Sequence, residues 1–132
     1  MSNGIYDGGE IKFFGVRRMT DDLCRITLPR EMMKMFSMRA KTNIGFRSVH
    51  IAGLGQGVFV YPTDHKTEAG RQIDYTGRFI VPFRMARALN IGAKTTVEMI
   101  PMKLDDCGSG VFIHKVPTLQ AEEIAREDTD NE

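Results

Sequence analysis

The sequence predicts a mainly β fold in which two tandem strand-strand-helix-strand-strand units share one core. Three observations lead to this prediction: an internal repeat, short segments rich in β-branched residues, and helical patterns of only two turns that each follow a proline. The chain has 132 residues. A unit of roughly 45 residues is too small to bury both faces of its own strands, so the two units must complete one core together.

The repeat has a period of 53 residues and runs without a gap. GQGVFVY at 55–61 aligns with GSGVFIH at 108–114, and the same offset gives twelve identities in the 44 aligned pairs from 18 to 61. Four of these identities are charged residues: Arg18 with Arg71, Asp21 with Asp74, Arg25 with Arg78, and Lys41 with Lys94. We interpret the repeat as a duplication, with one copy at 12–61 and the other at 68–116.

The second copy shows the order of elements most clearly. RQID and RFIVP are two short strands around the turn YTG, where Gly77 can adopt a positive φ angle. FRMARALN follows Pro82 as a short helix with apolar residues on one side, and Asn90 and Gly92 end it. TTVEMIP then alternates as a strand, DDCGSG is a loop, and VFIHKV is the last strand.

The first copy repeats this order with one change at its turn. Pro29 begins the equivalent helix, REMMKMFS, where a proline removes no amide donor that the helix needs. Cys24 stands where the second copy has Gly77, and a residue with a Cβ disfavours positive φ. We therefore expect the first turn to have a different geometry.

The net charge of +1 conceals a strong separation of charge along the chain. Residues 11–94 carry fifteen Lys and Arg against six Asp and Glu, a balance of +9, whereas residues 117–132 carry one Arg against six acids, a balance of −5. A basic body suits a nucleic-acid partner. The acidic tail at 117–132 is expected to be disordered, with a solubilising role, a protein partner or competition with DNA as its alternatives.

Several classes of function find no signal in the sequence. Two Cys in 132 residues indicate reduced thiols and a cytoplasmic protein, and no apolar run approaches the ~18 residues of a membrane span. No Cys or His spacing matches a metal site, and no set of nucleophile, base and orienting group can be assembled. We expect no metal, no cofactor, no membrane association and no enzymatic activity.

The segment DYTGRFIVPFRMARALNIGAKTTVEMI, followed by GVFIHKV, resembles the AbrB-type swapped-hairpin domain of the SpoVT/AbrB/MazE/MraZ superfamily. The shared pattern is Asp, three residues, Arg, a β-branched run, Pro, a basic helix and a strand. DDLCRITLPREMMKMFSM is similar to a more diverged copy. The resemblance covers residues 12–116 and implies an interlocked β-barrel in which hairpins swap between copies. One chain with two copies would then be a fused pseudo-dimer.

The resemblance also implies a double-stranded DNA-binding transcriptional regulator, associated with the nucleoid, that presents basic turns and helix starts to DNA. The contacts it implies are Arg18, Arg25, Lys34, Arg71, Arg78 and Arg87. The first basic helix position of the family falls on Met33 and Ala86. We add three nearby arginines as candidates of our own: Arg17, Arg30 and Arg84.

Asp21 and Asp74, four residues before Arg25 and Arg78, are expected to close the turns. They would do so by accepting hydrogen bonds from backbone amides or by orienting the arginine. Two further questions stay open from the sequence. The same barrel could instead be a protein-interaction module, either an antitoxin or an assembly protein, and pseudo-dimers could associate into a homo-oligomer.

Overall fold

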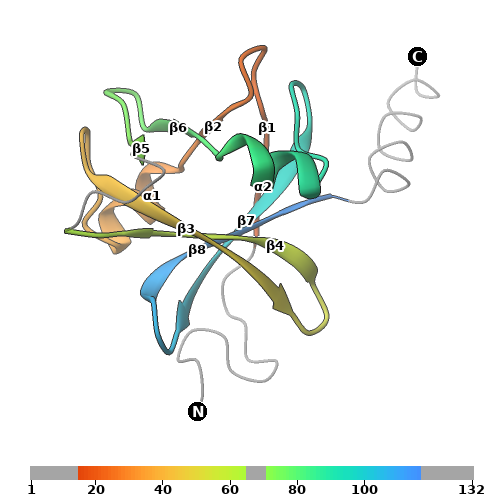
Figure 1. The fold of residues 1–132 in the computed structure, drawn as a ribbon. Coiled ribbons are helices and arrows are strands. Elements are labelled where there is room, and N and C mark those ends of the chain that lie inside the picture. Colours follow the sequence, from red (N-terminus) through yellow and green to blue (C-terminus); the bar gives the residue numbers. More distant parts are fainter. Residues whose placement is uncertain (1–14, 65–70, 117–132) are drawn as a thin grey trace, which may run out of the picture.

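Eight strands and two six-residue helices make up the described part of the chain, residues 15–64 and 71–116 of a computed structural model (Figure 1). The prediction of a mainly β fold with two short helices is confirmed. The predicted acidic tail at 117–132, and the first residues of both predicted copies, 12–14 and 68–70, lie outside the described residues. No helix in the described part is long and apolar enough to cross a bilayer.

The elements of the two halves have matching bounds. The first half contains β1 (Val16–Met19), β2 (Arg25–Thr27), α1 (Arg30–Met35), β3 (Asn43–Ile51) and β4 (Gly55–Pro62). The second half contains β5 (Arg71–Gln72), β6 (Arg78–Ile80), α2 (Phe83–Ala88), β7 (Thr96–Leu104) and β8 (Gly108–Lys115). From β2 to β4, every first and last residue lies 53 positions before its counterpart in β6 to β8.

Six strands form a curled antiparallel sheet, a half-barrel, in the order β1-β7-β8-β4-β3-β5, and β2 and β6 form a separate ribbon. Within the described residues, only β3 with β4 and β7 with β8 pair inside one half. The other pairs, β1 with β7, β4 with β8, β3 with β5 and β2 with β6, all join the two halves. The predicted strands on either side of YTG therefore pair with first-half strands and not with each other.

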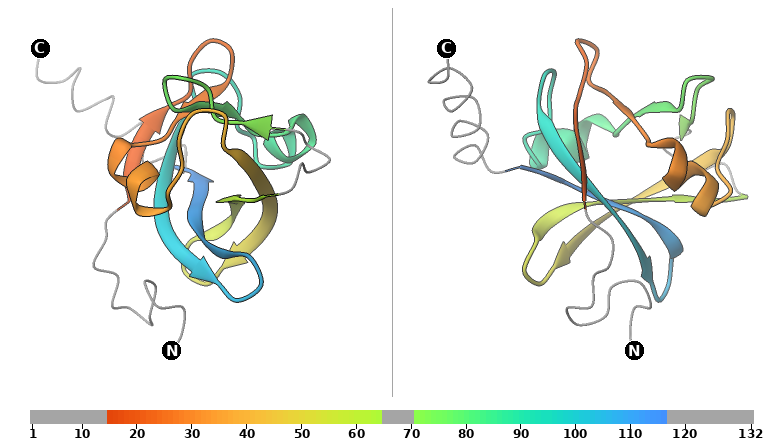
Figure 2. Two further views of the ribbon diagram at one scale, coloured as in Figure 1. Left: turned by 90° about the vertical axis from the view of Figure 1, so that its left-hand side faces the viewer. Right: turned by 180° about the vertical axis from the view of Figure 1, so that it is seen from behind.

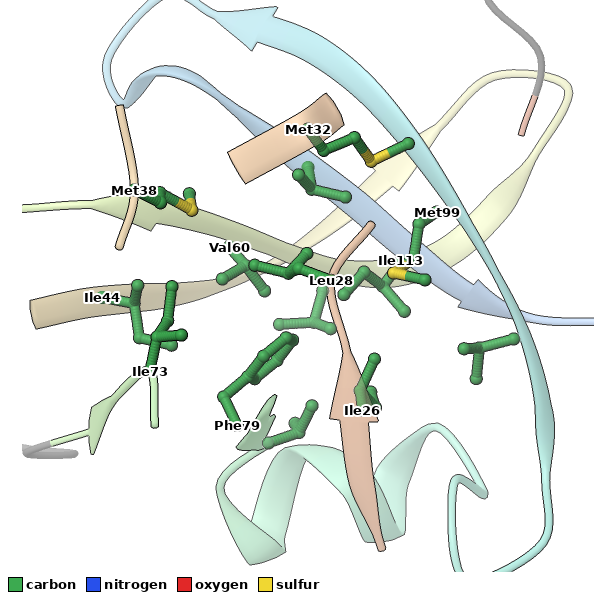
Figure 3. Packing of buried hydrophobic residues seen from close by; sticks show 14 of the residues in the cluster. Ile26, Leu28, Met32, Met38, Ile44, Val60, Ile73, Phe79, Met99 and Ile113 are labelled. Atoms are coloured by element: carbon green, nitrogen blue, oxygen red, sulfur yellow. The ribbon is translucent and has the colours of Figure 1, made fainter. Parts of the chain in front are cut away.

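The main core lies inside the curl of the sheet, between the sheet and the ribbon (Figure 3). Ile26 of β2 and Phe79 of β6 are register partners, and both side chains are buried in this core. On the sheet, Val60 pairs with Val111 across the β4·β8 ladder, and both are fully buried. Each half thus contributes apolar side chains to one shared core.

A second apolar cluster covers the other face of the sheet. Phe59 and Phe112 are register partners in β4 and β8 and are fully buried, with Ile100 and Met102 beside them. The central strands are therefore buried on both faces, which explains their continuous apolar runs, VFV and VFI, in place of an alternating pattern.

The two Asp-Arg turns have the same backbone geometry, so the expectation of a different first turn is wrong. Cys24 adopts φ 65°, close to the 83° of Gly77. The amide of Cys24 donates to the Asp21 carbonyl at 3.0 Å, as the amide of Gly77 does to Asp74 at 3.1 Å. Hydrogen bonds to the aspartate fix the turn, and cysteine occupies the left-handed region at a cost that glycine avoids.

Candidate nucleic-acid interface

Both Asp-Arg turns, the β2·β6 ribbon and the two helices gather on one side of the molecule, opposite the tips of the β3–β4 and β7–β8 hairpins (Figures 1 and 2). This arrangement follows from the pairing between halves, because β2 and β6 cross the open side of the curled sheet. The described cations that the sequence singled out lie mainly on this side, which we call the turn side.

The aspartates hold the two turns and their arginines together. Asp74 Oδ1 accepts hydrogen bonds from the amides of Thr76 and Arg78, both at 2.9 Å, and Oδ2 accepts one from Arg78 Nε at 3.1 Å. Asp21 does the same with the amides of Leu23 and Arg25 and with Arg25 Nε, at 2.9, 2.8 and 2.7 Å. Each carboxylate therefore bonds both to backbone amides and to the arginine side chain.

These hydrogen bonds keep both aspartates ionised. Burial alone would raise the pKa of Asp74, but hydrogen bonds from the Arg78 amide, from Thr76 and from the Arg78 side chain lower this pKa from 3.8 to about 2. The hydrogen bond from the Arg25 amide likewise lowers the pKa of Asp21. Each aspartate accepts its side-chain hydrogen bond from the arginine Nε. The two terminal nitrogens of each guanidinium therefore make no hydrogen bond to that aspartate.

Arg25 and Arg78 occupy the outer face of the ribbon. Ile26 and Phe79 point into the core, so their neighbours on β2 and β6 point outward. Arg25 pairs with Ile80 and Arg78 with Thr27, which places the two arginines on one diagonal of the ribbon. Their side chains are 29% and 31% exposed, so both reach solvent while packed against the ribbon.

Arg71 joins the two ribbon arginines in a shallow hollow of about 320 Å³, lined also by Asp74. Arg71 is only partly exposed, and its Nε is buried without a hydrogen-bond partner among the described residues. A buried guanidinium N–H normally has an acceptor. Three guanidinium groups around one hollow, one of them short of an acceptor, form an arrangement suited to an anion.

Two further hollows occupy equivalent places in the two halves. The first, which we call the basic hollow, has a volume of about 510 Å³ and lies between α1 and the second turn. It brings together four cations: Arg18, Arg30, Lys34 and Arg39. The hydroxyl-bearing residues Thr27, Tyr75 and Thr76 also line it, beside apolar residues such as Leu28 and Met33. The cations and hydroxyls of this hollow are donors of the kind that bind phosphate.

The second, which we call the apolar hollow, has a volume of about 370 Å³ and lies between α2 and the first turn. Its lining is mainly apolar: Leu23, Ile80, Val81, Phe83, Ala86 and Ile91. Two cations, Arg71 and Arg87, take the positions of Arg18 and Lys34. Phe83 replaces Arg30, so the two halves present different chemistry on equivalent backbones.

Two of the candidate arginines lie apart from these hollows. Arg17 is next to Arg18 on β1 and so points to the opposite face, where its Nε is 3.9 Å from Glu98 Oε2. Arg84 is exposed on α2 and lines none of the three hollows. Arg39 was not among the predicted contacts, because the second copy has Gly92 at the equivalent position and so the repeat does not single it out.

The donors on the turn side are guanidinium, ammonium and hydroxyl groups, which bind anions. Among residues 15–64 and 71–116, no group of three or more His, Cys, Asp or Glu side chains could hold a metal ion. No protein-family model, curated protein or solved structure matches the chain. A proposal for function therefore depends on the residues themselves.

Proposed function

We propose that this chain is a double-stranded DNA-binding transcriptional regulator of the AbrB type, acting by occupancy of its site. The observation that carries the proposal is the pair Arg25 and Arg78, each held by an aspartate on the outer face of one ribbon. The basic hollow and Arg71 extend this cationic surface on the same side of the molecule.

The strand order supports a fused pseudo-dimer with swapped hairpins. The order β1-β7-β8-β4-β3-β5 reads the same from either end if each strand is exchanged for its counterpart 53 positions away. β1 pairs with the second half and β5 with the first. This is the exchange expected when two copies of a swapped-hairpin unit close one barrel, and it relates Arg25 to Arg78 by an approximate two-fold axis.

The β2·β6 ribbon belongs to a kind of element that DNA-binding proteins use. A two-stranded β-ribbon fits the major groove of B-DNA, where an arginine can bind O6 and N7 of guanine in a bidentate manner. Arginines at the flanks can instead bind phosphates, which position the protein without reading sequence. The Asp74 and Asp21 contacts hold each ribbon guanidinium in one orientation before binding, which lowers the entropy lost on contact.

The difference between the hollows predicts unequal half-sites. The basic hollow holds four cations, whereas the apolar hollow holds Arg71 and Arg87 beside apolar side chains. Phosphate contacts should therefore be denser on the half-site that faces α1. The target sequence would be a pseudo-palindrome with one dominant half.

The test is a binding titration on double-stranded DNA from upstream of the chain's own gene, with unrelated duplex DNA for comparison. We expect Arg25→Ala/Arg78→Ala to weaken binding about tenfold or more, since each removes a charged contact. The matched control is Arg47→Ala/Lys103→Ala, which also removes two exposed cations but from β3 and β7, outside the three hollows. Equal losses in both variants would reject the assigned surface, and no binding to any DNA would reject the function.

A further inference from the structure

We propose that the apolar hollow is a docking site for the chain's own segment 117–132, and that docking there competes with DNA for Arg71 and Arg87. The regulatory half of this proposal rests on the proposed function. The docking half does not, because it concerns contacts within one chain. Three features of the chain support docking: the chemistry of the hollow, the composition of the segment and the place where the segment begins.

The apolar hollow exposes large side chains that a folded domain ordinarily covers. Phe83 is 70% exposed, Leu23 64% and Ile80 37%. All three line the same concave surface. Arg87 lies with its guanidinium carbon 6.0 Å from the centre of the Phe83 ring, so a cation borders the apolar surface directly. Apolar side chains gathered in a hollow with polar residues at the rim are typical of a binding site.

The fold itself does not require these apolar residues. The first half builds the equivalent hollow on equivalent backbone and places Thr27 and Arg30 where the second half has Ile80 and Phe83. Thr27 and Arg30 are exposed, as are Ile80 and Phe83. Packing therefore gives no reason for the apolar pair, whereas an apolar ligand would.

The segment 117–132 complements the hollow in its apolar residues and in its charge. Its sequence, PTLQAEEIAREDTDNE, carries the apolar residues Leu119 and Ile124 with Glu122 and Glu123 between them. Its charge is −5, against +9 for residues 11–94. Leucine and isoleucine suit the apolar lining, and the two glutamates suit Arg71 and Arg87. A tethered segment also binds at a high effective concentration, so modest contacts suffice.

The segment begins close to the hollow. Val116, the last described residue, donates its amide to the Thr96 carbonyl at 3.0 Å. The adjacent Thr95 donates its amide to Thr20 Oγ1 at 2.8 Å, and that hydroxyl donates to the Gly92 carbonyl. Gly92 lines the apolar hollow. Because an extended chain advances about 3.3 Å per residue, a few residues past Val116 are enough to reach it.

Docking is tested first without DNA, by NMR of the full chain labelled with ¹⁵N. The tail variant Leu119→Ser/Ile124→Ser should shift the amide signals of Leu23, Ala86 and Gly92 while leaving those of Met33 and Arg39 in the basic hollow. The hollow variant Ile80→Thr/Phe83→Arg, which copies the first half at exposed positions, should make residues 119–124 more mobile on the picosecond to nanosecond timescale. Both effects should be independent of protein concentration.

Two results would overturn docking by the segment. If the amide signals of Leu23, Ala86 and Gly92 have the same positions in the tail variant as in wild type, the segment does not bind in the hollow. Effects that disappear on dilution would assign the hollow to a second copy of the chain instead. The hollow variant changes two exposed side chains, and the tail variant changes residues outside the described part of the chain. A thermal unfolding curve for each variant verifies that the fold persists.

Regulation is tested next, by DNA titration of the same tail variant, which leaves the charge of the segment unchanged. If docking competes with DNA, Leu119→Ser/Ile124→Ser should bind DNA about fivefold more tightly than wild type, the lower range of an ordinary coupling between sites. Docking without this gain would overturn the regulatory role. Failure of both proteins to bind DNA would overturn the proposed function, while the NMR result would still decide whether the segment docks.

Discussion

The carboxylate of Asp74 accepts hydrogen bonds from both the backbone amide and the guanidinium Nε of Arg78, at 2.9 and 3.1 Å. One side chain thus fixes the shape of the turn and the direction of the arginine that follows it. Asp21 and Arg25 repeat the arrangement in the other half. The aspartates therefore connect local backbone geometry to the surface that we assign to DNA.

Asp74→Ala should lower the free energy of unfolding by about 1–2 kcal/mol, because it leaves the amides of Thr76 and Arg78 without their acceptor. Asp74→Asn keeps one carbonyl acceptor, so its free energy of unfolding should fall by less than that of Asp74→Ala. Urea unfolding at neutral pH measures both. The control is Asp22→Ala in the first turn, which removes a carboxylate that is 82% exposed and lies 3.3 Å from Lys94 Nζ. For this variant the free energy of unfolding should change by less than about 0.5 kcal/mol.

Stability should also depend on the ionisation of Asp74. Its folded pKa of about 2 lies below the ordinary 3.8, so the folded state favours the carboxylate. The stabilisation is complete above pH 3.8 and is lost as the pH falls towards 2. Because the Asp74 side chain is 39% exposed, solvent screening reduces its pH-dependent contribution to the free energy of unfolding to about 1 kcal/mol. Unfolding curves between pH 5 and pH 2 should show a smaller decline in the free energy of unfolding for Asp74→Asn than for wild type. Equal declines in the two proteins would contradict the lowered pKa of Asp74.

Much of the fold was predictable because it is encoded locally. The 53-residue offset and the prolines before each helix anticipate the order of the elements, and Pro29 and Pro82 do stand at the N-caps of α1 and α2. Pairing was not predictable from the local pattern, because the sequence around YTG suggests a local hairpin whereas β5 and β6 pair with the other half. An exchange between copies was an expectation of the family resemblance alone. Contacts between segments far apart in the chain leave no local pattern.

The candidate site was predictable in part for the same reason. Arg25 and Arg78 belong to a local Asp-to-Arg motif, which the sequence displays. The basic hollow combines Arg39, after α1, with Thr76 of the second turn, and only the tertiary structure brings these together. Arg17 and Arg18 are adjacent in sequence, yet strand geometry places them on opposite faces of β1.

Cys24→Gly should stabilise the protein, and Gly77→Cys should destabilise it. Cys24 has φ 65°, a conformation costly for a residue with a Cβ, and glycine removes that cost at the expense of a more flexible unfolded chain. We expect a net gain of about 0.5–1 kcal/mol. At position 77, φ is 83° and a Cβ would lie 3.0 Å from Met33 Sδ, so a loss of about 1–3 kcal/mol follows. Reducing conditions during urea unfolding exclude disulfide formation, and a stabilised Gly77→Cys would contradict the argument.

The salt dependence of DNA binding should identify which cations bind phosphate. If six phosphates are neutralised, log Kobs should fall against log[salt] with a slope near −5, at about 0.9 for each phosphate. Arg30→Ala and Arg39→Ala each remove one cation from the basic hollow, so each should reduce the slope by about 0.9. Arg17→Ala is the matched control, since Arg17 faces Glu98 on the other side of β1 and should leave the slope unchanged. A slope that changes for Arg17→Ala but not for Arg30→Ala would move the phosphate contacts away from the basic hollow.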